Sequence, residues 1–105
     1  TNNVALGNTA LDDGSLSGGC NTAIGANVLT ANTTGLTNTG IGFNALAQTT
    51  TGNCNVAVGA FANCSNVSGG NNVSVGRNSL LNNTASDNTA VGFNSLNANT
   101  TGIAI

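Results

Sequence analysis

The chain has 105 residues with one basic and three acidic side chains, which give a formal net charge of −2. A nucleic-acid-binding protein needs a field of Lys and Arg to displace counterions from phosphates, and Arg77 alone does not provide one. The same shortage argues against attachment to anionic lipid, and no apolar run is long enough to insert into a bilayer.

A five-residue phrase, running from an Asn to a Gly, recurs along the chain about every 17 residues. The first copy reads Asn-Val-Ala-Leu-Gly and the fourth reads Asn-Val-Ala-Val-Gly. A fixed period of this length is typical of a stacked array whose unit is too small to fold alone. The phrases begin at Asn3, Asn21, Asn38, Asn55, Asn72 and Asn88, and they end at Gly7, Gly25, Gly42, Gly59, Gly76 and Gly92.

The middle three residues of each phrase predict a short strand. The residue after each Asn is β-branched, and the residue two positions later is aliphatic. Because alternate residues of a strand share a face, we expect these two positions to point into the core and the small residue between them to point outward. An outward stripe of small, uncharged residues suggests close packing against another chain. This predicted oligomer interface consists of Ala5, Ala23, Gly40, Ala57, Ser74 and Ala90.

The remainder of each coil predicts turns and a second strand. The glycine that closes each phrase lets the backbone turn, because Gly adopts positive φ without steric cost. A second short strand is expected to follow and to end on a leucine, and then a polar arc such as residues 31–35 leads to a second corner. We expect the repeated Asn residues to form a ladder, with each amide bonded to those above and below. The predicted fold is an all-β, parallel β-solenoid (β-roll) of about six ~17-residue coils, a single domain over residues 1–105 that is about 25–30 Å long.

Three cysteines are an odd number and do not indicate a disulfide framework. Cys20 and Cys54 occupy one column two rungs apart, or about 9–10 Å, which is too far for a disulfide bridge. Cys54 and Cys64 lie on one coil and would meet only if both pointed inward. We interpret all three as small buried or semi-buried thiols rather than as a redox or metal site.

The phrases resemble the head repeats of YadA-like trimeric autotransporter adhesins and the related repeats of phage and large-virus tail fibres. Asn-Thr-Ala-Ile-Gly at 21–25 and Asn-Val-Ala-Val-Gly at 55–59 are similar to the head repeats, and residues 32–42 are similar to the fibre variety. The resemblance implies three β-rolls wound side by side with small residues at the three-fold axis. The coil is longer than the usual head repeat, and no neck, coiled-coil stalk or membrane anchor follows within the chain.

The residues for catalysis or for a cofactor are lacking in this sequence. There is no His, and the adjacent Asp12 and Asp13 are expected to form a turn with Gly14 rather than a functional pair of carboxylates. We therefore expect a non-enzymatic chain without catalytic, metal or cofactor residues. Its expected role is that of a structural or adhesive segment of a longer fibre protein, outside the cell, on a cell surface or on a virion.

The expected partners follow from this interpretation. Copies of the same chain are the main one, as a homo-oligomer and most simply a parallel trimer, with a host surface glycan or protein as a second partner for the polar arcs. Two alternatives remain at this point. One is an ice-binding solenoid, since Thr33, Thr50, Thr84 and Thr100 align in one column. The other is a subunit that stacks end to end into a filament, because neither end of the repeat array carries a cap.

Overall fold

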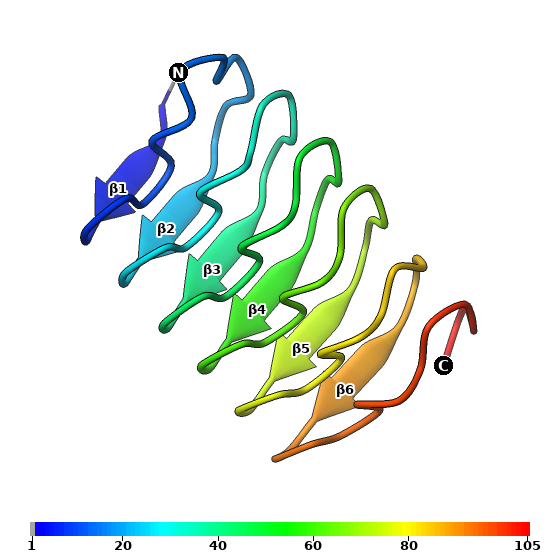
Figure 1. Cartoon of the computed structure of the whole chain (residues 1–105). Coiled ribbons are helices and arrows are strands. Elements are labelled where there is room, and N and C mark those ends of the chain that lie inside the picture. Colours follow the sequence, from blue (N-terminus) through cyan, green and yellow to red (C-terminus); the bar gives the residue numbers. More distant parts are fainter. Residues whose placement is uncertain (1) are drawn as a thin grey trace.

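The computed structural model describes residues 2–105 as a stack of six short parallel strands in one sheet. Neighbouring strands pair in register, so that Ala23, for example, lies opposite Gly40. Each rung consists of one strand and one return loop, and the two termini lie at opposite ends of the stack (Figure 1). The predicted parallel β-solenoid is confirmed, and its longest dimension is 31 Å. The strands are β1 (Val4–Leu6), β2 (Thr22–Ile24), β3 (Thr39–Ile41), β4 (Val56–Val58), β5 (Val73–Val75) and β6 (Thr89–Val91).

Each strand ends at the glycine of the repeated phrase because the backbone there adopts a conformation that other residues rarely reach. These glycines have φ between +119° and +136°. They also stack closely on one another, since a Cβ added to Gly59 would lie 2.7 Å from the carbonyl carbon of Gly76. The glycine column is therefore required both for the turn and for the spacing between rungs.

Replacing Gly59 with alanine should destabilise the rod by at least about 2 kcal/mol, because both the positive φ and the contact with Gly76 become unfavourable. Gly14 is a matched control, since its φ is not in the left-handed region and a Cβ there meets nothing within 4 Å. Urea denaturation followed by circular dichroism measures both variants. Equal midpoints for the two alanine variants would contradict the role given to the glycine column.

The return side of each coil is a run of tight turns, and the prediction of a second strand ending on a leucine is wrong. Ala45 donates its backbone N–H to Gly42, and Ala47 donates to Asn44, so that successive four-residue turns follow one another. The leucines of this side have φ of +49° to +53°, outside the strand region, at Leu11, Leu29, Leu46, Leu80 and Leu96. A pattern of polar and apolar residues does not reveal this, because Leu is seldom found at positive φ.

The core lies between the sheet and this run of turns. Leu29, Leu46 and Leu80 are fully buried, and the small residues at the middle of the strands face them from the sheet side. A Cβ added to Gly40 would lie 2.6 Å from Cγ1 of Val28, so the interior has no room for a larger side chain there. Within residues 2–105 there is also no helix of the length and apolarity that crossing a membrane requires.

The predicted facing of the strand residues is therefore reversed in the structure. Ala23, Ala57 and Ser74 have no exposed surface and Ala90 only 2%, while Gly40 is also buried. Ala5 alone is exposed, on the first rung, where β1 has a neighbouring strand on one side only. The column is made of small residues because the coil is thin, and from the second rung on its side chains line the interior rather than the outer surface that was expected to be an oligomer interface.

Candidate functional site

The exposed face of the sheet consists of the residues that were expected to fill the core. We call it the sheet face. It has two outer columns, and neither contains a charged residue. Ile24, Ile41 and Val56 in the middle rungs are 36–37% exposed, and Leu6 and Val91 on the end strands are each 67% exposed. The first outer column is Val4, Thr22, Thr39, Val56, Val73 and Thr89, and the second is Leu6, Ile24, Ile41, Val58, Val75 and Val91.

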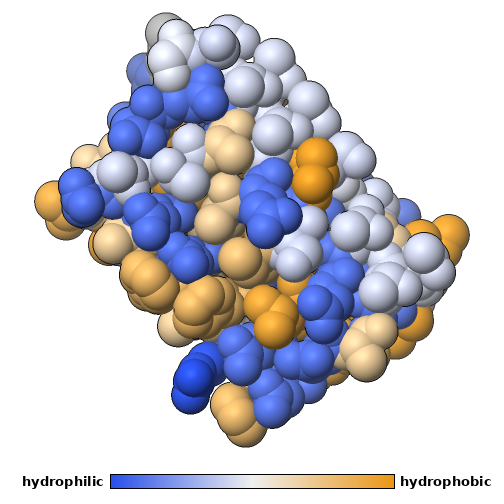
Figure 2. Space-filling model, in the orientation of Figure 1, coloured by the Kyte–Doolittle hydropathy of each residue, from blue (hydrophilic) through white to orange (hydrophobic). Residues whose placement is uncertain are grey.

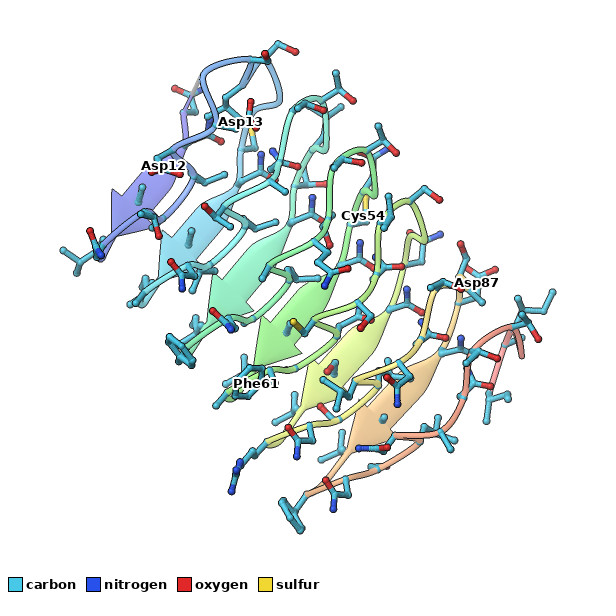
Figure 3. The ribbon with its side chains drawn as sticks, in the orientation of Figure 1. Asp12, Asp13, Cys54, Phe61 and Asp87 are labelled. Carbon is cyan, nitrogen blue, oxygen red and sulfur yellow. The ribbon has the colours of Figure 1, made fainter. Side chains whose placement is uncertain are left out.

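Aromatic side chains extend the apolar surface beyond one edge of the sheet face. Phe43 and Phe93 follow the glycines that end β3 and β6, and they are 48% and 67% exposed. The Phe61 ring packs edge-on against the Phe43 ring, with centroids 5.4 Å apart. In Figure 3 Phe61 lies at the arrowhead end of β4, and Cys54 lies on the opposite side of the molecule, where the strands begin. Elsewhere, in the view of Figure 2, polar and apolar residues are intermixed on the surface.

The Asn column forms a ladder, but most of its bonds run from side chain to backbone rather than from amide to amide. Asn55 is fully buried, its Oδ1 accepts the backbone N–H of Asn72 at 3.0 Å, and its Nδ2 donates to the carbonyl of Gly69 at 2.9 Å. The same two bonds recur at Asn3, Asn21, Asn38, Asn72 and Asn88. Asn55 also donates to Oδ1 of Asn38, which is the one amide-to-amide contact in the ladder. The column thus holds the strand start of one rung to that of the next.

A second Asn column, buried on most rungs and not predicted from the repeat, supports the same corner. Asn66 donates to the carbonyl of Gly69 at 2.8 Å, so that this carbonyl accepts amide protons from both Asn55 and Asn66. The spacing Asn-x-x-Gly before the corner is the signal that could have revealed this column. In the third rung a threonine takes the position, and Thr49 donates its hydroxyl to the Asn66 carbonyl. The column comprises Asn32, Asn66, Asn83 and Asn99.

Two of the four aligned threonines of the polar arc have hydroxyls that bond within the chain. Thr33 Oγ1 donates to the carbonyl of Thr50, and Thr84 Oγ1 donates to the carbonyl of Thr100 at 3.0 Å. These hydroxyls stabilise the stacking of the arcs in the same way as the Asn amides stabilise the corner. Their protons are consequently occupied by the backbone of the next rung.

The acidic residues lie in separate local environments. Oδ1 of Asp13 accepts the backbone N–H of Ser15, consistent with the predicted turn at Gly14, and Oδ1 of Asp12 accepts the hydroxyl of Thr30. Asp87 accepts the amide of Asn71. Residues 2–105 bring together no group of three His, Cys, Asp or Glu side chains that could hold a metal ion, and they form no pocket.

The three thiols are free, and two of them are more exposed than the sequence suggested. Cys20 and Cys54 are exposed at the turns that precede β2 and β4, so their predicted burial is wrong. Cys64 is buried. Both exposed thiols have φ of +60° on the turn before a ladder Asn, which directs them outward. Burial raises the pKa of the Cys64 thiol, and a backbone hydrogen bond with Ala47 opposes this effect only in part.

No family model, curated protein or solved structure matches the chain in comparisons with known proteins. Among the described residues, the second outer column of the sheet face presents an aliphatic side chain on every one of the six rungs.

Proposed function

We propose that this chain is a non-catalytic structural segment of a fibre outside the cell, on a cell or virion surface, and that copies of it associate through the sheet face. The observation that carries the proposal is the pair of uncharged outer columns, which runs without interruption over all six strands. The second column is aliphatic on every rung, and the first contains only valine and threonine. Isolated apolar side chains are normal on a protein surface, whereas a contiguous row of them indicates an interaction site.

A second copy of the chain fits this face better than an unrelated partner does. The side chains of each outer column repeat once per rung, at the strand spacing of about 4.8 Å. Only a surface with the same repeat can match them along the whole rod, and a copy of the chain provides such a surface. The rod measures 31 × 20 × 16 Å, so one whole side of it, made of the sheet face and the turns that flank it, offers about 500–600 Å², and a pair of copies would bury about twice that. This area reaches the ~1,000 Å² that a specific interface requires.

The resemblance of the repeated phrases to trimeric adhesin heads favours three chains in parallel. In such an arrangement the sheet faces meet around the common axis, and the polar arcs remain on the outside. The arcs are then free to contact a host glycan or protein, and weak contacts of this kind gain strength from many copies along a fibre.

Replacing Ile41 with lysine should convert an assembled chain into a folded monomer. Ile41 is 37% exposed in the middle of the sheet face, so a lysine there stays solvated in the monomer but introduces a charge into an apolar interface. Sedimentation of the parent chain should give about three times its 10.1 kDa mass, and the I41K chain should sediment as a monomer with an unchanged circular dichroism spectrum.

Asn82→Lys provides the control, because Asn82 is exposed on the return side of the rod, away from the sheet face. The N82K chain should assemble like the parent chain. A parent chain that remains monomeric at concentrations of about 100 µM would contradict lateral association through the sheet face.

Ice binding is the second candidate function, and a monomeric chain would favour it, because an ice-binding surface also requires a flat, regular face. Thr22-x-Ile24 and Thr39-x-Ile41 place β-branched side chains in register on two successive rungs. A monomer that shows thermal hysteresis and shapes ice crystals would support this second candidate. Growth without a limiting size, followed by light scattering, would instead indicate end-to-end stacking through the outer edges of β1 and β6.

A further inference from the structure

The half-turn of residues 59–66, which returns from β4, differs from the same segment in every other rung. Four buried side-chain N or O atoms within residues 2–105 have no hydrogen-bond partner. Two of them are both polar atoms of the Asn63 amide, and a third is Oδ1 of Asn44, one rung before. Since buried polar groups in proteins are nearly always paired, three such atoms on two successive rungs require an explanation.

Asn63 occupies the leucine column of the core. It is fully buried, and its φ of +50° matches the values of Leu46 and Leu80 on the rungs at either side. Asn tolerates this positive φ, but its buried side-chain amide has no hydrogen-bond partner. Opening of this half-turn would return the amide to water, so the free-energy cost of opening is lower here than in a rung with leucine.

Phe61 also departs from its column, since it is an aromatic residue at a position that is polar on the other rungs. The corresponding residues of the other rungs are Thr9, Asn27, Asn44, Asn78 and Asn94, all with positive φ. Thr9 donates its hydroxyl to Oδ1 of Asn27, so side chains of this column can bond from one rung to the next. Oδ1 of Asn44 has no such donor, and Phe61 on the following rung cannot provide one. Phe61 keeps its edge-on contact with Phe43, but it also takes a backbone angle that is unfavourable for an aromatic residue.

We propose that residues 60–65 form a local opening unit, which leaves the core while the rest of the rod stays folded, and that its opening makes the Cys64 thiol available for modification. Cys64 is 9% exposed in the closed rod and directly follows Asn63. It lies on the return side, so association through the sheet face does not cover it. The stability of a protein varies from one segment to another, and a segment with unpaired polar groups opens at lower cost.

The test measures the reaction of Cys64 with Ellman's reagent in a chain that carries Cys20→Ser and Cys54→Ser. The Cys64 thiolate attacks the disulfide of the reagent, forms a mixed disulfide and releases thionitrobenzoate, whose absorbance is followed. Local opening predicts a reaction rate that stays nearly constant in low urea, because little surface is exposed in the opening step. If Cys64 became exposed only through global unfolding, the reaction rate would instead rise steeply with urea concentration.

Two variants in this background identify the cause. Asn63→Leu restores the leucine column and should slow the reaction by roughly tenfold or more, since it removes two unpaired buried atoms. Phe61→Asn gives Asn44 a donor and should slow it severalfold. Asn82→Ala removes an exposed amide on the same rod and should leave the rate within about twofold of the parent. Rates with the full urea dependence of global unfolding, or a folded N63L or F61N chain that reacts at the parent rate, would overturn the proposal.

Discussion

Replacing Ala57 with glutamate should unfold the solenoid. Ala57 has no exposed surface and lies on the inner face of β4, so a carboxylate at this position would be buried without a partner. An unpaired buried charge costs at least several kcal/mol, which is comparable with the whole stability of a domain of this size, about 5–15 kcal/mol. The far-UV circular dichroism spectrum of the A57E chain at neutral pH should be that of an unfolded chain.

Val56→Glu is the matched control, because the adjacent residue points to the opposite side of the strand. Val56 is 36% exposed on the sheet face, so its glutamate stays in contact with water. The V56E chain should therefore keep the β-sheet spectrum of the parent chain and lose only its ability to associate. A folded A57E monomer would mean that the small residues face outward after all, and it would reverse the orientation of the sheet described above.

The second large effect is expected for Asn55, in the middle of the buried ladder. Asn55→Ala removes the acceptor of the Asn72 backbone N–H and one of the two donors to the Gly69 carbonyl. The Asn72 N–H loses its acceptor, whereas the Gly69 carbonyl keeps the amide of Asn66, so one buried group is left unpaired and the free energy of unfolding should fall by roughly 1–3 kcal/mol. Urea denaturation followed by circular dichroism measures the change, and it should also show broader unfolding, since rungs on the two sides of the lesion are coupled only through their neighbours.

Asn55→Asp should have a larger effect at neutral pH than at acidic pH. A buried carboxylate has no proton to donate to the Gly69 carbonyl, and desolvation raises its pKa in the folded chain above the value in the unfolded chain. The folded state therefore binds the proton more tightly, so stability should be greatest below the unfolded pKa and should decrease as the pH rises through the folded pKa. The N55D chain is accordingly expected to denature at a higher urea concentration at pH 4 than at pH 7.

Asn82→Asp controls for the change of charge, because Asn82 is exposed and bonds only to the carbonyl of Asn97. Its denaturation midpoint should differ little from that of the parent chain at either pH. An N55D chain that is as stable as N82D at pH 7 would show that the Asn ladder contributes little to stability.

The spacing of the Asn and Gly residues alone was enough to predict the solenoid. Asn21, Asn38 and Asn55 recur every 17 residues, and that period fixes which residues lie above one another, whatever the exact path of the chain between them. The glycine at the end of each phrase marks a position where the backbone needs positive φ, which is a local property that a sequence records directly. The in-register parallel pairing of β1 to β6 follows from these two regularities.

The tertiary structure decided which side of the strand faces the core. Strict alternation along Val56, Ala57 and Val58 separates two faces, but it does not say which of them is buried. The usual assumption, that the larger apolar side chains are inside, fails here because the coil is thin and the leucines of the return side already fill it. Only alanine, glycine or serine fits opposite them, so valine and isoleucine remain outside.

The positive φ of the leucines on the return side could not be predicted from the local sequence either. Leu46 and Leu80 adopt positive φ, which leucine disfavours, because complete burial in the core compensates for the cost of the backbone angle. Such compensation depends on the neighbours one rung above and below, so the residue type alone does not predict it. The sequence by itself thus determined the stacking period, the ladder and the turns at glycine, whereas the interior volume of the coil determined which face is buried and which face is left for a partner.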